Sequence, residues 1–367
     1  MYIIIFIIIL ATLVFVHELG HFLVAKAAGI RVDEFALGFP PRLASFTRGG
    51  TRYALNLIPF GGYVKIFGED NETNDAGEPA SVIDPQSFVA KPKYVQALVL
   101  LAGIAFNIIF AWLLLSLSFL AGMPAPTDYP GAGTVQNSVL TITSVVKNSP
   151  ADAAHLQTGD RITTLSAQDG TVSKPTSEAI QNFTSHHENK PIAITFIRGS
   201  ETKNVTVTPT VRSGDKATIG IAMETLGTVR FGFFGSLWEG AKLTKTIISA
   251  TALGLVNFVG TALTGHAKVA DVTGPVGIAG LVNDATHLGF SYVLSFTALI
   301  SINLAIINLI PFPALDGGRV LFVIIEKIRG KSLNQKIVRI VNTTGLALLL
   351  LLMVVVTYHD ITKLFVK

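Results

Sequence analysis

The chain has no cysteine and few charged residues. Without cysteine it can form no disulfide, bind no metal through thiolates and use no cysteine nucleophile. Charged residues make up 14% of its 367 residues, half of the residues are hydrophobic, and the mean hydropathy is +0.54. That combination excludes an ordinary soluble domain of this length and indicates a membrane protein. The net charge of +4 is small and gathers in one loop, which argues for membrane orientation rather than nucleic-acid binding.

Four apolar segments are long enough to cross a bilayer: residues 2–28, 94–121, 292–325 and 341–358. The first lacks the basic start of a signal peptide and exceeds the length of its apolar core, so we expect a retained helix. The loop after the third segment is basic, with Lys327, Arg329, Lys331, Lys336 and Arg339 against Glu326. Because cytoplasmic loops are rich in lysine and arginine, this loop is expected in the cytoplasm.

The same topology decides how residues 247–263 are interpreted. This stretch is apolar and almost long enough to span, but a fifth span would move the N-terminus and residues 124–229 to the cytoplasmic side. We therefore predict an interfacial helix. The expected order is an N-terminal membrane region, an extracytoplasmic domain, an interfacial linker region and a C-terminal membrane region, at 1–123, 124–229, 230–290 and 291–367.

The first apolar segment ends in the pentapeptide HELGH, residues 17–21. Residues four apart share one face of a helix, so His17 and His21 can bind one ion, with Glu18 at the edge of that face. This is the spacing of zinc-binding metalloprotease helices, in which the glutamate is a general base rather than a ligand. The motif lies deep in the segment, where ionisable groups are costly and indicate function. The alternative is two interfacial histidines beside a glutamate that reaches the headgroups.

The third apolar segment carries a candidate third ligand. Pro311 and Pro313 break its helix in mid-membrane, and Asp316 is the only acid of the segment. A carboxylate at this depth needs a cation, which a zinc ion held by the two histidines would provide. An ion pair with Arg319 is the alternative. Asn308 could bind a substrate backbone or satisfy carbonyls freed by the prolines.

A mostly apolar β-hairpin is expected between the first two spans, in residues 35–70. Two short runs, 42–46 and 51–58, flank Gly49-Gly50, a typical hairpin turn. Such backbone enters a bilayer only where protein or a water-filled cavity satisfies its amides. The hairpin either dips in beside the zinc helix or lies on the membrane surface.

Two further segments carry weaker signals. Gly103 and Asn107 share a face of the second span, where close helix packing alone would explain a small residue and a bridging amide. Residues 71–84 are acidic and rich in turn formers, and we predict them to be disordered.

Residues 124–212 form short alternating runs separated by turn residues, which predicts a small β-rich domain. The run NSPADAAHLQTGDRI, residues 148–162, resembles the helix-turn-strand signature of a PDZ domain. His155 stands where that signature has a glycine in left-handed conformation, so we expect a cost of up to about 1 kcal/mol or a shifted turn. His186 and His187 are expected to be solvated rather than to bind metal.

Together these motifs resemble the site-2 proteases, intramembrane zinc metalloproteases, and most closely the bacterial regulator-of-sigma-E protease type with a single PDZ domain. HELGH matches the family's H-E-x-x-H, and NLIPFPALDGGR at 308–319 matches its N-x-x-P-x-P-x-L-D-G-G. The resemblance implies Zn2+ ligation by His17, His21 and Asp316, with Glu18 as catalytic base. The hairpin looks like the family's membrane-re-entrant β-loop, which holds the substrate as an added strand. Candidate substrate-binding residues are then Asn308, Asn107, Gly103, Gly61 and Gly62.

The expected fold is a polytopic α-helical membrane protein with four transmembrane helices, a membrane-re-entrant β-hairpin and an inserted β-rich PDZ-like domain. The resemblance implies hydrolysis of a peptide bond within or near the transmembrane segment of single-span membrane proteins, such as trimmed anti-sigma factors or remnant signal peptides. Expected partners are these substrates and the lipid bilayer of the inner (plasma) membrane, with the active site toward the cytoplasm and no nucleic acid. A non-catalytic PDZ scaffold and a transporter are the rival classes, although the two halves show no inverted repeat.

Overall fold

The chain folds into two compact units in the computed structural model, which describes residues 2–69, 84–126, 129, 135–199, 201–211, 216–265 and 273–365. The first unit comprises Met1–Ser116, Leu237–Val282 and Ser295–Lys367, and the second comprises Leu117–Ser236 and Asn283–Leu294. Residues 230–290, predicted as one linker region, are thus shared between the units. Residues 71–83, predicted to be disordered, lie outside the described residues.

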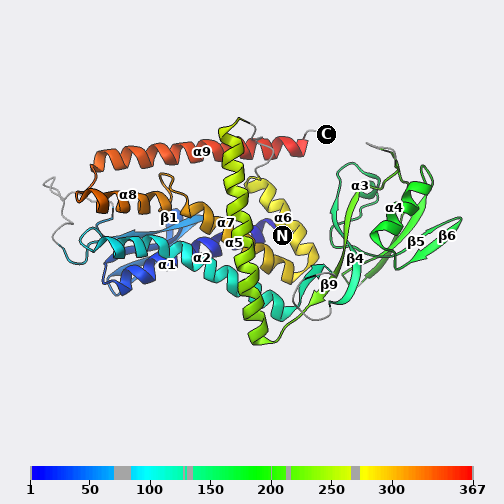
Figure 1. Cartoon of the computed structure of the whole chain (residues 1–367), viewed down its shortest axis with the longest axis horizontal. Coiled ribbons are helices and arrows are strands. Elements are labelled where there is room, and N and C mark those ends of the chain that lie inside the picture. The colour runs from blue at the N-terminus through cyan, green and yellow to red at the C-terminus, as the bar shows by residue number, and fades with distance from the viewer. Residues whose placement is uncertain are drawn as a thin grey trace. The chain divides into compact units, whose positions relative to one another are not determined.

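The first unit is built mainly from helices (Figure 1). Those lying wholly or mostly within it are α1 (Tyr2–Ala27), α2 (Lys93–Ala121), α5 (Phe233–Leu263), α6 (Pro275–Leu288), α7 (Phe290–Leu309), α8 (Asp316–Arg329) and α9 (Gln335–Phe365). The predicted third span is divided into α7 and α8 by residues 310–315. Pro311 and Pro313, which have no amide to donate, lie in that break, as the sequence predicts.

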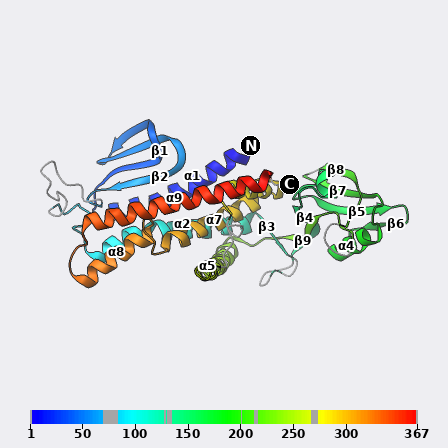
Figure 2. The same ribbon diagram turned by 90° about the horizontal axis from the view of Figure 1, so that it is seen from above.

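Five helices among the described residues are long and apolar enough to cross a membrane, so the expected count of four spans is not confirmed. They are Ile3–Ala27, Lys93–Ala121, Phe233–Ala262, Phe290–Leu309 and Lys336–Thr362. The additional candidate arises because residues 247–263 continue a helix that starts at Phe233, with no proline to interrupt it. Within the first unit α5 runs across the direction shared by α1, α2, α7 and α9 (Figures 1 and 2). The place of residues 247–263 at the membrane interface stays a prediction.

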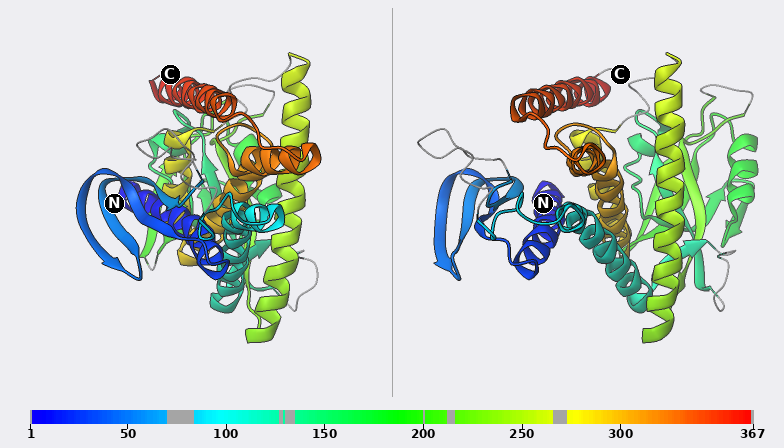
Figure 3. Two further views of the ribbon diagram at one scale, coloured as in Figure 1. Left: turned by 90° about the vertical axis from the view of Figure 1, so that its left-hand side faces the viewer. Right: turned by 60° about the vertical axis from the view of Figure 1, so that its left-hand side comes forward.

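A small sheet formed by β1 (Val32–Arg48) and β2 (Thr51–Ile66) packs against α1 (Figure 3). Register shifts divide each strand into two extended segments, and a segment of one strand pairs with one or two segments of the other. Gly49 and Gly50, between the strands, have φ values of 59° and 75° and form the predicted hairpin turn. Across the sheet the extended segments follow in the order 62–66, 32–39, 51–58 and 42–48, which leaves 62–66 at one edge.

Glu34 ties these extended segments together. Its largely buried carboxylate accepts hydrogen bonds from the guanidinium of Arg42 (2.9 Å) and the hydroxyl of Tyr63 (3.0 Å). Arg52 Nη1 lies 3.6 Å away. Since the three partners come from the three other segments, Glu34 fixes the edge that carries Tyr63.

The second unit contains an antiparallel sheet and two short helices. Its strands are β3 (Met123–Pro126), β4 (Gln136–Val145), β5 (Arg161–Ala167), β6 (Gly170–Ser173), β7 (Ile192–Arg198), β8 (Glu201–Val207) and β9 (Ile221–Val229), in the order β3-β9-β4-β5-β7-β8 with β6 on β5. The helices α3 (Pro150–Ala153) and α4 (Ser177–His186) begin after the capping side chains of Ser149 and Thr176. The β-rich character predicted from the sequence is present, and the PDZ-like assignment stays a prediction.

Three histidines of this unit can be compared with the predictions made for them from the sequence. His155 adopts the left-handed conformation of the glycine it replaces, with φ of 56°, so the turn is kept. The expectation that His187 is solvated is wrong, because the residue is only 6% exposed. Its Nε2 lies 2.7 Å from Asp169 Oδ1, and its Nδ1 lies 2.8 Å from the carbonyl oxygen of Phe183. Residues that adjoin on a helix face different ways, so His186 stays at the surface.

Candidate metal centre

Three potential ligands meet inside the first unit: His17, His21 and Asp316. The two histidines lie one helical turn apart on α1, and Asp316 is the first residue of α8. The Nε2 atoms of His17 and His21 are 3.1 Å apart, and Asp316 Oδ2 lies 3.0 Å and 3.4 Å from them, respectively. Both histidines are less than 9% exposed. The structure therefore brings together the three residues that the sequence analysis names as metal ligands.

These atoms fit a zinc ion. Tetrahedral zinc with bonds of about 2.0–2.2 Å holds its ligand atoms roughly 3.3 Å apart, close to the three separations observed. Apart from the two histidine Nε2 atoms, the buried Asp316 Oδ2 has no hydrogen-bond partner among the described residues, as expected of an atom that binds the same cation as those nitrogens. His21 Nδ1 lies 2.8 Å from the carbonyl oxygen of Val99. Since a carbonyl only accepts, this nitrogen carries the proton and leaves the Nε2 lone pair for a metal.

Asn107 lies beside the other ring nitrogen of His17. Its side-chain nitrogen lies 3.3 Å from His17 Nδ1, and its buried Oδ1 has no hydrogen-bond partner in the described part of the chain. A half-turn of the amide brings Oδ1 to a protonated Nδ1 and frees Nε2 of His17 for metal. The hydroxyl of Ser301 on α7 donates to the backbone carbonyl oxygen of Asn107 (2.8 Å), which fixes this part of α2.

Glycines let α1 and α2 approach closely at the site. A Cβ built on Gly103 would overlap His21 Nε2 and lie 2.7 Å from His17 Cε1. A Cβ on Gly20 would lie 2.5 Å from the carbonyl oxygen of Ala102. Gly20 was not singled out from the sequence, although it is the glycine of HELGH and the residue before a predicted ligand. Contact of Gly103 and Asn107 with a substrate stays a prediction, since the neighbours seen here are the histidines.

Asp316 is positioned by a tightly folded turn. A Cβ on Gly317 would overlap the carbonyl oxygens of Leu309 and Ile310, and one on Gly318 would overlap that of Phe312. The two glycines after Asp316 are therefore required for the turn to fold over the start of α8. Arg319, the alternative partner of Asp316, places its Nη1 2.6 Å from Glu69 Oε1.

A cavity of about 420 Å³ opens beside the three ligands. Glu18 lines it from α1, and the edge segment of β2 lines it from the other side with Tyr63, Val64, Lys65 and Ile66. A Cβ on Gly62 would come within 3.5 Å of Glu18 Cγ and 3.2 Å of Val14 Cγ1. The sheet edge thus lies directly against the predicted base.

The other predicted residues lie farther from this cavity. Gly61 has a φ of 113° and packs under the ring of Phe39, so it shapes the bend of β2. Asn308 is half-buried in the last turn of α7 and is not among the described residues that line the cavity.

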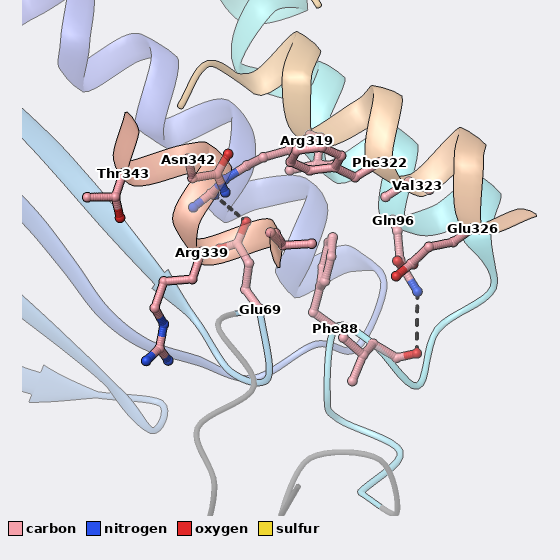
Figure 4. Close-up of a pocket in the computed structure, with 13 residues that line it drawn as sticks. Glu69, Phe88, Gln96, Arg319, Phe322, Val323, Glu326, Arg339, Asn342 and Thr343 are labelled. Carbon is pink, nitrogen blue, oxygen red and sulfur yellow. Dashed lines mark hydrogen bonds and ion pairs between the residues drawn. The ribbon is translucent and has the colours of Figure 1, made fainter. Parts of the chain in front are cut away.

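A second cavity of about 530 Å³ adjoins the first (Figure 4). The two share Glu69, Leu100 and Arg319 in their walls, and the ion pair between Glu69 and Arg319 is drawn as a dashed line. Glu326, Arg339 and Asn342 also line the second cavity. Polar side chains therefore continue from the metal centre toward α9.

Comparisons with known proteins identify the family of this chain. The profile of peptidase family M50 matches residues 5–352. The zinc metalloprotease RasP of Bacillus licheniformis is 32% identical, with 98% of each chain covered. The regulator of sigma-W protease RasP of Bacillus subtilis is 30% identical at the same coverage. The chain therefore belongs to peptidase family M50, the site-2 protease family that its motifs predict, and it is a zinc metalloprotease.

Proposed function

We propose that this metalloprotease cleaves a peptide bond within or near the transmembrane segment of single-span membrane proteins. The observation that carries the proposal is the buried meeting of His17, His21 and Asp316 inside a unit built from apolar helices. Ionisable groups are costly to bury in a membrane and by default indicate a function there. By family resemblance, the substrates are trimmed anti-sigma factors or remnant signal peptides.

His17, His21 and Asp316 would hold the zinc ion, and Glu18 would act as general base. When bound, zinc supplies the Lewis acid that activates water and polarises a peptide carbonyl. Glu18 lies one residue from a ligand, lines the same cavity and is not part of the ligand group. Its carboxylate takes a proton from the attacking water and returns it to the leaving amine. Asn308 would assist by donating a hydrogen bond to a substrate carbonyl.

The edge segment 62–66 would hold the substrate as an added strand. A peptide bond in a helix is covered by neighbouring turns, so a transmembrane helix must unwind locally before attack. An exposed sheet edge offers backbone donors and acceptors to an extended peptide, and this edge lines the same cavity as Glu18. The second unit would then lie outside the cytoplasm as a PDZ-like filter or docking domain, with the zinc site toward the cytoplasmic side.

The test compares two single-span substrates in detergent with the purified protein. One has an apolar segment that contains a helix-weakening Gly-Pro pair, and the other has leucines at those positions. We expect cleavage of the first within the apolar segment, mapped by mass spectrometry, and slower cleavage of the second. Cleavage confined to the soluble flanks of both substrates would contradict the proposal.

A further inference from the structure

The helix α9 rests on the turn that precedes Asp316. Gly345 is buried where α9 crosses Pro313. A Cβ built on Gly345 would lie 2.6 Å from Pro313 Cβ and 2.7 Å from the Pro313 carbonyl oxygen. The backbones of α9 and of the turn are therefore in direct contact, and no larger residue fits between them without moving one of them.

One turn earlier on the same face of α9, Asn342 holds the next residue of that turn. Its Oδ1 accepts a hydrogen bond from the backbone nitrogen of Ala314 at 3.2 Å. Asn342 is half-buried on α9 and lines the second cavity together with Arg319 (Figure 4). A side-chain amide in a mostly apolar span needs such a partner.

The same hydrogen bond supports an unusual backbone conformation at Ala314. Its φ is 72°, in the left-handed region that alanine rarely adopts. The turn around it is too short to satisfy every amide by itself. Leu315 N reaches back to the Phe312 carbonyl oxygen, whereas Ala314 N reaches out to α9. The conformation two residues before Asp316 therefore depends on a side chain of another helix.

We propose that Asn342 and Gly345 are positioning residues of the metal centre, which hold the Pro313–Ala314 turn and through it the Asp316 carboxylate. This inference rests on the proposed ligand role of Asp316. The support that α9 gives to the centre is then indirect, because none of its described residues belongs to the ligand group. Neither residue stands out by local sequence pattern.

The far end of α9 supplies a matched control. There Asp360 Oδ2 accepts a hydrogen bond from the backbone nitrogen of Gly277 on α6, at 2.8 Å. Like Asn342, Asp360 anchors α9 through a side-chain acceptor to a backbone amide, but this anchor does not touch the turn before Asp316. Gly254 on α5 is a control for Gly345, because a Cβ built there has no atom within 4 Å.

The experiment measures Zn2+ affinity of the full-length protein in detergent by competition with a chelating dye. The variants are Asn342→Ala, Asn342→Asp and Gly345→Ala, with Asp360→Ala and Gly254→Ala as controls. We expect Asn342→Ala and Gly345→Ala to bind Zn2+ about 10–100-fold more weakly than wild type, the usual effect of losing an outer support of a ligand. Asn342→Asp keeps an oxygen acceptor and should stay within about twofold of wild type, as should both controls.

The outcomes distinguish a failure of the positioning role from a failure of the proposed function. Wild-type Zn2+ affinity in both Asn342→Ala and Gly345→Ala would overturn the positioning role alone. Equal weakening by Asp360→Ala would overturn it as well, because any loosening of α9 would then suffice. A wild type that binds no Zn2+ would overturn the proposed function and this inference with it. Since alanine favours a helix over glycine, Gly345→Ala should not unfold α9, and thermal unfolding of each variant checks this.

Discussion

Gly103→Ala is expected to dismantle the metal centre while leaving the fold in place. The added Cβ would overlap His21 Nε2 and lie 2.7 Å from His17 Cε1 and 2.9 Å from His17 Nδ1. Heavy atoms that are not bonded prefer separations of about 3.5–4.0 Å. Relieving the overlap therefore requires the rings to move by roughly 1 Å relative to α2.

The size of the effect follows from the narrow range of metal–ligand distances that a zinc site tolerates. Metal–ligand distances hold to within about 0.2 Å, so a shift five times larger displaces two of the three ligands. We expect Zn2+ affinity to fall about 100-fold, the upper end of the effect of losing an outer support, which corresponds to about 2.7 kcal/mol. Proteolysis should fall at least about 100-fold at limiting zinc, the usual result of a 1 Å misplacement.

The assay is Zn2+ binding and substrate cleavage of the purified variant, beside Gly254→Ala as a matched glycine-to-alanine change in open space. The control should behave as wild type in both measurements. Thermal unfolding of both variants verifies that the fold persists. Wild-type Zn2+ affinity of Gly103→Ala would contradict the prediction, because it would show that an added Cβ fits between α2 and the two histidine rings.

Three further predictions concern the supports of the site and of the second unit. Asn107→Ala removes the partner of His17 Nδ1 and should weaken Zn2+ binding about tenfold or more, whereas Asn107→Asp keeps an acceptor for the Nδ1 proton. Equal Zn2+ affinities of these two variants would contradict the assignment of that proton to His17 Nδ1. The hydrogen bond that His187 donates to the Asp169 carboxylate raises the pKa of His187, so this bond stabilises the fold below the unfolded pKa of about 6.5 and is lost as pH rises through the raised value. His187 also lowers the pKa of Asp169, so the bond is lost again as pH falls through that lower value. Melting temperature should therefore decline toward alkaline pH in wild type, and an identical decline in His187→Gln would refute the assignment. Arg198→Ala leaves the buried Asp160 carboxylate without guanidinium bonds of 2.6 and 2.7 Å and should destabilise the second unit by about 3 kcal/mol in thermal melts; an unchanged melt would show that solvent replaces the pair.

The three residues that meet at the candidate metal centre could be predicted from sequence because each carries a local signal. Two histidines at helical spacing define one face, and an acid between helix breaks in an apolar run has few reasons to exist without a cation. The same reasoning found the break before α8 and the Gly49-Gly50 turn, since proline and glycine act on their own backbone.

Other features depend on contacts between distant segments, and no local pattern announces them. Gly20 matters because α2 crosses it, and Asn342 matters because the Ala314 amide points at it. The length of α5 was underestimated because only its second half is continuously apolar. His187 looked solvated because its partner, Asp169, lies in the turn between two strands of the sheet.

The most direct test of the account is cleavage of a single-span substrate by wild type and by Glu18→Gln, with bound zinc measured in the same samples. Glu18 is not in the ligand group, so both proteins should hold one zinc ion per chain. Only the wild type should cut within the apolar segment, and a chelator should stop it. Equal cleavage by the two proteins, with equal zinc, would contradict the role of Glu18 as general base and with it the proposed chemistry.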